Sequence, residues 1–126
     1  MSYHFYNNNP SGKIINDETV RAYSLVTGEN WQKSYIALAM QGFILGDMPT
    51  SMGVLGSLLK QRGFRRHVVS NVHGDRYTLS DFLGEHDKGV YVLIFDNHCV
   101  ACIDGVYYNA HDVGNEVPQY YWVREV

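Results

Sequence analysis

The fold is indicated most directly by residues 98–109, HCVACIDGVYYN, in which two apolar runs flank the dipeptide Asp104-Gly105. Asp-Gly between two such runs is a strong signal for a two-residue type I′ turn, which joins antiparallel strands. We therefore expect a β-hairpin in which Ile103 pairs with Val106.

This register also predicts which polar side chains share a face of the hairpin. Pairing outward from the turn places Val100 opposite Asn109, and His98 opposite His111. Directly paired residues project to one side, so His98, Asn109 and His111 are expected on one face, with Asn109 ~7–8 Å from His98. An asparagine placed there can hold the imidazole in one tautomer, as in a Cys-His-Asn triad. In the alternative interpretation, these residues only form a polar edge of the hairpin and have no catalytic role.

The sequence around the hairpin predicts helices first and strands afterwards. Four helices are expected from their caps and stops: one from Asn16 or Asp17 to Gly28, one from Asn30 to Gly42, one from Thr50 or Ser51 to Gly63, and a short one from Thr78. Arg62, Arg65, Arg66 and His67 are interpreted as the solvated end of the third helix. Strands are expected at 90–95, 98–103, 106–109 and 117–123, and residues 3–12 are expected to be irregular. The predicted class is α+β, with N-terminal helices packed on a four-stranded C-terminal antiparallel sheet, in a single domain over residues 1–126.

Composition and charge narrow the classes of partner. A net charge of −3 is mild and does not predict a surface for nucleic acid. The longest apolar run, residues 90–95, is too short to span a bilayer, and no secretion signal opens the sequence. Cys99 and Cys102 are expected to point to opposite faces of one strand, which argues against a disulfide between them or a shared metal. We expect a cytoplasmic protein without a cofactor.

Several motifs resemble a family of small proteins with the papain-like cysteine peptidase fold, found in Firmicutes-type bacteria and their phages. The motifs are GK at 12–13, DETVRAYSLVTGENW at 17–31, LGDMP at 45–49, RGF at 62–64, YTLSDF at 77–82, KGVYVL at 88–93, His98, DGVYY at 104–108 and EVPQYYW at 116–122. The resemblance covers nearly the whole chain. It implies a papain-like fold, in which a nucleophile at a helix N-terminus precedes a histidine and then Asn or Asp along the chain.

The resemblance also implies that this chain departs from the family at its active site. In the family, a cysteine stands where this chain has Glu18, an aspartate usually stands at the position of Asn109, and a tryptophan at that of His111. Glu18, His98 and Asn109 would therefore be the positions of a degenerate triad, with Asp17 and His111 lining the same cleft.

The substitution at position 18 determines the chemistry that we expect. A helix N-terminus favours an anion, so a glutamate is stable there and could pair with His98. A carboxylate is a poor nucleophile toward an amide, and loss of a triad nucleophile typically costs ~10⁶-fold in kcat. Cys99 is expected to face away from His98, and Cys102 to lie ~13 Å along the strand, so neither replaces the missing thiol.

Two hypotheses about function follow. In the first, the chain is a catalytically degenerate papain-like domain that binds a peptide or a host protein in the old cleft. In the second, it is a hydrolase with a non-thiol or metal-assisted site built on Glu18, His98 and His111, which have the donor types of a two-His, one-carboxylate site. A Glu18–His98 hydrogen bond in a metal-free cleft would favour the first.

Overall fold

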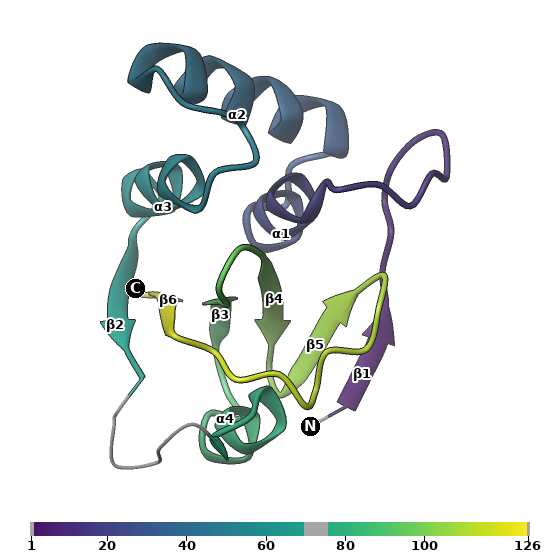
Figure 1. Cartoon of the computed structure of the whole chain (residues 1–126), viewed down its shortest axis with the longest axis vertical. Coiled ribbons are helices and arrows are strands. Elements are labelled where there is room, and N and C mark those ends of the chain that lie inside the picture. Colours follow the sequence, from purple (N-terminus) through teal and green to yellow (C-terminus); the bar gives the residue numbers. More distant parts are fainter. Residues whose placement is uncertain (1, 70–75, 126) are drawn as a thin grey trace.

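The computed structural model describes residues 2–69 and 76–125 and confirms the α+β class. The helices are α1 (Glu18–Thr27), α2 (Trp31–Leu45), α3 (Met52–Gln61) and α4 (Leu79–Glu85). The strands are β1 (Ser2–Phe5), β2 (Phe64–Val68), β3 (Val90–Ile94), β4 (Cys99–Ile103), β5 (Val106–Asn109) and β6 (Tyr120–Arg124). Helices α1 to α3 lie on one side of the sheet and α4 lies on the other (Figure 1). No helix in the described ranges is long and apolar enough to cross a bilayer.

The sheet has six strands in the order β1-β5-β4-β3-β6-β2, which corrects the expected four-stranded antiparallel sheet. The first additional strand, β1, falls in the segment expected to be irregular and pairs parallel to β5, so the sheet is mixed. Tyr3 explains this pairing, because its ring packs 5.5 Å from that of Tyr107 and its hydroxyl donates to the Asn109 carbonyl at 3.0 Å.

The second additional strand, β2, contains Arg65, Arg66 and His67, three of the four basic residues that were interpreted as a solvated helix end, whereas Arg62 is the C-cap residue of α3. Strand β2 forms the sheet edge opposite β1 and pairs antiparallel with β6. The Arg66 guanidinium lies 4.3 Å from the Tyr120 ring centroid, and His67 stacks on Tyr121 at 5.5 Å. Charged side chains on an edge strand also discourage pairing with another chain.

Three of the four expected helix starts are confirmed by side-chain caps, and one expected helix end was wrong. Asn30, Ser51 and Thr78 each accept a backbone hydrogen bond at the start of a helix. Helix α2 continues past Gly42 to Leu45 and ends at Gly46, which has a left-handed φ of 72°. A Cβ atom on Gly42 would lie 2.5 Å from the Asp47 carbonyl oxygen. Gly42 is therefore needed for close packing rather than as a helix stop.

The hairpin is confirmed next to its turn. Ile103 pairs with Val106, and Asp104 and Gly105 both have positive φ, as a type I′ turn requires. The ladder continues to the pair Ala101–Tyr108. The last strand is shifted from the expected 117–123 to Tyr120–Arg124.

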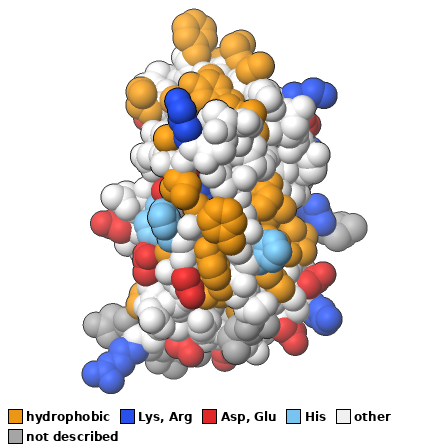
Figure 2. Space-filling view, turned by 90° about the vertical axis from the view of Figure 1, so that its right-hand side faces the viewer, with side chains coloured by type: hydrophobic (Ala, Val, Ile, Leu, Met, Phe, Trp, Pro, Cys, Tyr) orange, Lys and Arg blue, Asp and Glu red, His pale blue; other side chains and the backbone are white. Residues whose placement is uncertain are grey.

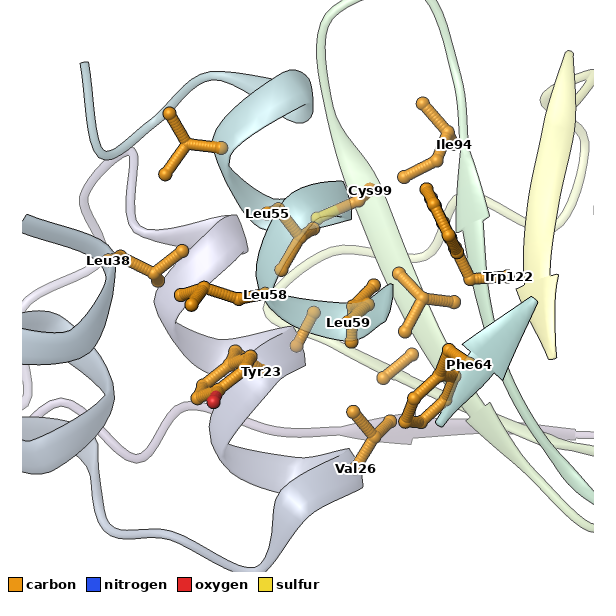
Figure 3. Packing of buried hydrophobic residues seen from close by; sticks show 14 of the residues in the cluster. Tyr23, Val26, Leu38, Leu55, Leu58, Leu59, Phe64, Ile94, Cys99 and Trp122 are labelled. Atoms are coloured by element: carbon orange, nitrogen blue, oxygen red, sulfur yellow. The ribbon is translucent and has the colours of Figure 1, made fainter. Parts of the chain in front are cut away.

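Two apolar clusters cover the two faces of the sheet. The cluster beneath α1 to α3 contains Tyr23, Leu38, Leu55, Leu59 and Trp122, which interlock in Figure 3. The cluster beneath α4 contains Phe82, Leu93 and Tyr107, among others. Cys99 belongs to the first cluster and Cys102 to the second, which confirms that their side chains point to opposite faces. Both cysteines are free.

The close approach of α3 to β6 yields a first prediction. A Cβ atom on Gly56 would lie 2.7 Å from the Trp122 ring, whereas a Cβ on Gly53 in the same helix meets only the Ser51 hydroxyl, at 3.5 Å. We expect Gly56→Ala to lower the free energy of unfolding by ~1–3 kcal/mol through overpacking. Gly53→Ala should leave it unchanged or raise it by up to ~1 kcal/mol through helix propensity. Urea unfolding of both variants tests this, and equal stabilities would contradict the packing.

Candidate functional site

The candidate site is built around the first turn of α1. Asp17 is the N-cap residue, yet its side chain does not cap the helix. Glu18 is the first helical residue and is half-buried. The Asn16 side-chain amide, oriented with its nitrogen toward Glu18, donates to the Glu18 carboxylate. The predicted position of Glu18 at the N-terminus of the first long helix is therefore confirmed.

The N-terminus of α1 faces β4. Helix α1 packs on β4, and the charges of Glu18 and Arg21 both act on the Cys99 thiol. Burial raises the pKa of Cys99 far above its usual range, the negative charge of Glu18 raises it further, and Arg21 opposes the shift. Glu18 therefore lies near the start of β4, where His98 directly precedes Cys99.

A buried polar network lies one turn into α1. The Arg21 Nε atom donates to Asp17 Oδ1 at 2.9 Å, and Arg21 Nη1 donates to Asn109 Oδ1 at 2.6 Å. The indole nitrogen of Trp31 donates to the second Asp17 oxygen at 2.9 Å. The Arg21 and Asp17 side chains are only 5% and 4% exposed. The network therefore joins α1 to the start of α2 and to the end of β5, and withdraws Asp17 and Asn109 from solvent.

The sequence interpretation did not identify Arg21 as part of the site. The available signal was the spacing of Asp17 and Arg21, because an acid and a base four residues apart lie on one side of a helix. No local pattern indicated that Asn109 would accept from this arginine, since the two residues are 88 positions apart.

His98 has a different partner from the one expected. Its Nε2 atom lies 2.7 Å from Glu116 Oε1, and its ring stacks on Phe95 at 4.7 Å with an interplanar angle of 7°. No hydrogen bond or ion pair joins His98 to Glu18 or to Asn109 within residues 2–69 and 76–125. The expected contacts of His98 are therefore absent, because Glu116 holds its ring and Arg21 holds Asn109.

His111 lies outside the paired part of the hairpin. It is exposed, in a bend after β5, and β4 begins only at Cys99, so the expected pair of His98 and His111 does not form. In the part of the chain that is described, no three His, Cys, Asp or Glu side chains are grouped to hold a metal ion. Glu18, His98 and His111 are thus not arranged as one ligand set.

Neither cysteine is placed for nucleophilic chemistry. Cys99 and Cys102 are both buried, and burial raises the pKa of each thiol far above its usual range. A thiol in such surroundings stays protonated at neutral pH and is a weak nucleophile.

Comparisons with protein-family models, with curated proteins and with solved structures found no match for this chain.

The buried network yields a second prediction. Arg21→Met removes the counter-charge of Asp17 and should lower the free energy of unfolding by ~3–5 kcal/mol, the cost of leaving one member of a buried ion pair alone. The control is Arg65→Met, which removes an exposed ion pair with Glu125 and should cost less than ~1 kcal/mol. Chemical denaturation measures both, and a loss for Arg21→Met as small as that of the control would contradict the role of the network.

Proposed function

We propose that the chain is a catalytically degenerate papain-like domain that binds a peptide, presented by a host protein, at the N-terminus of α1. The observation that carries this proposal is Glu18, a carboxylate at the first residue of the helix that packs on β4, where the resembled family has its nucleophilic cysteine. The papain-like assignment rests on the sequence motifs and on this helix-to-strand arrangement.

The state of the remaining polar groups supports binding rather than catalysis. His98 is held by Glu116, and Asn109 is held by Arg21, so neither is free to activate a group at position 18. The two thiols of the chain are buried and protonated. A nucleophile, a base and an orienting group in mutual contact are the requirement for acyl transfer, and these contacts are missing here.

The charges at this end of the sheet favour a cationic ligand. Glu18 acts electrostatically on Cys99, and Glu116 contacts His98, so both carboxylates lie near the start of β4. The Glu116 side chain is 47% exposed and Glu18 is half-buried. Carboxylates that are partly shielded from water attract a guanidinium or ammonium group more strongly than fully exposed ones. The preferred ligand is therefore a peptide segment with a Lys or Arg side chain.

The third prediction tests this proposal with peptides that are selected from a random displayed library for binding to the wild-type protein. We expect enrichment of Lys or Arg, and a dissociation constant at least tenfold weaker for Glu18→Arg, since ~1.4 kcal/mol corresponds to tenfold. The matched control is Asp87→Arg, which makes the same charge change at an exposed residue just after α4, the helix on the other side of the sheet.

The same peptides should be recovered intact after long incubation with the wild-type protein. If the selected peptides bound Glu18→Arg as tightly as they bind the wild type, the binding site could not lie at the N-terminus of α1. Hydrolysis of the peptides that is lost in Glu18→Gln would instead support the hydrolase hypothesis.

A further inference from the structure

Strand β2 is an edge of the sheet, and the outer side of its backbone has no hydrogen-bond partner in the part of the chain that the structure describes. It pairs with β6 alone. The Glu125 N–H donates to the Gly63 carbonyl at 3.1 Å, and such bonds use every second residue of an antiparallel strand. Arg65 and His67 therefore bond to β6, as Gly63 does. The residues whose N–H and C=O groups point away from β6 are Phe64, Arg66 and Val68.

A groove lies at this edge, where the end of α3 and strand β6 meet β2. Its volume is about 840 Å³, which is in the range of ligand sites in proteins. The charged side chains that line the groove are three cations, Lys60, Arg65 and Arg66, and one carboxylate, Glu125. All four are exposed. The groove therefore adjoins the open backbone of β2 and carries mainly positive charge.

Two of the three cations lack a carboxylate partner. Arg65 forms an exposed ion pair with Glu125 at 3.8 Å, whereas no carboxylate of residues 2–69 and 76–125 pairs with Lys60 or Arg66. The Arg66 guanidinium lies over the Tyr120 ring, which leaves its N–H groups available to a carboxylate. The sequence also has no Asp or Glu at positions 48–74. The edge at β2 is thus locally cationic in a chain whose net charge is −3.

The two edges of the sheet differ in charge. Strands β2 and β1 lie on opposite sides of the molecule in Figure 1. Strand β1 has the sequence SYHF, without Lys, Arg, Asp or Glu. Figure 2 shows the β1 side, where hydrophobic and histidine side chains, not Lys or Arg, occupy the middle of the surface. The β2 edge, unlike the β1 edge, therefore presents cationic side chains that select a ligand by its charge.

We propose that β2 binds an acidic segment of another protein, which extends the sheet as an additional strand beside β2. In this mode of recognition, main-chain hydrogen bonds supply affinity and side-chain contacts supply specificity. Arg65 and Arg66 are consecutive, so their side chains project to opposite faces of the sheet. An acidic side chain on either face of the added strand therefore lies beside an arginine.

Other occupants fit this edge less well. A second copy of β2 would bring like charges together, and charges on an edge strand oppose such pairing. An acidic strand converts the same repulsion into attraction. Single-stranded nucleic acid normally stacks its bases on accessible aromatic rings, whereas the rings that line the groove, Phe64 and Trp122, are only 3% and 9% exposed.

The fourth prediction concerns a fluorescein-labelled peptide in which Glu and Val alternate. At ~0.1 M salt the wild-type chain should bind this peptide at least about tenfold more tightly than a Lys–Val peptide of the same length, as measured by fluorescence polarisation. Arg66→Glu should weaken binding about tenfold or more, because it replaces an attraction with a repulsion. The matched control is Lys88→Glu, the charge reversal of another exposed cation, before β3. It should change the dissociation constant less than about twofold, since salt screens a remote charge, and circular dichroism would verify that both variants fold.

Two N-methylated forms of the Glu–Val peptide separate strand addition from attraction between charges alone. Methylation of every Glu nitrogen or of every Val nitrogen removes one alternate set of N–H groups, and only one set faces β2 in an added strand. One form should therefore lose binding and the other should keep it. In hydrogen-exchange NMR of the unmodified complex, the amides of Phe64, Arg66 and Val68 should become protected, whereas those of Arg65 and His67, already bonded to β6, should gain much less.

A wild-type chain that does not bind the Glu–Val peptide, or that binds both N-methylated forms equally well, would overturn the proposal. Unchanged exchange at the outward amides of β2 in the complex would also overturn it. Tighter binding of a single-stranded DNA oligonucleotide that displaces the peptide, and that is lost in Arg66→Glu, would assign the groove to nucleic acid instead.

Discussion

The guanidinium of Arg21 is the group on which the arrangement of the site depends. A buried charge is tolerated only when it is paired and hydrogen-bonded, and Arg21 satisfies this through Asp17 and Asn109. Asp17 is bound in turn by Trp31, and the Asn109 carbonyl by Tyr3. One buried cation thus links α1 and the start of α2 to β5 and β1. Rotation or sliding of α1 would leave Arg21 or Asp17 unpaired in the interior.

The position of Glu18 follows from this anchoring. Arg21 lies three residues after Glu18, so fixing its head group against β5 also fixes the first turn of α1 against the sheet. The helix N-terminus, which stabilises an anion, is thereby directed toward the start of β4. A thiol at position 18 would gain reactivity from the same helix N-terminus, because the helix stabilises the thiolate anion. A carboxylate gains only charge stabilisation, and His98 and Asn109 have other partners in this chain.

The sequence predicted best those features that are determined locally. The Asp104-Gly105 turn and the caps Asn30, Ser51 and Thr78 depend on a few neighbouring residues, and all four are confirmed. Strands β1 and β2 were missed because their partners are distant in sequence: β1 pairs with β5, about a hundred residues later. The partner of Asn109, Arg21, was missed for the same reason, whereas Glu116 was missed because it stands between β5 and β6, outside the hairpin from which the surroundings of His98 were predicted. Gly42 misled the assignment of a helix end because a glycine needed for close packing resembles one needed as a stop.

Position 18 is an anion-stabilising position at the accessible end of α1, and the pKa of a thiol introduced there tests this property most directly. In Glu18→Cys the pH dependence of alkylation should give a thiol pKa below the usual value of ~8.5. The introduced thiol should react in the native state, while Cys99 and Cys102 should react only after unfolding. An introduced thiol with an ordinary or raised pKa, or one that is labelled no faster than the two native cysteines, would contradict this account.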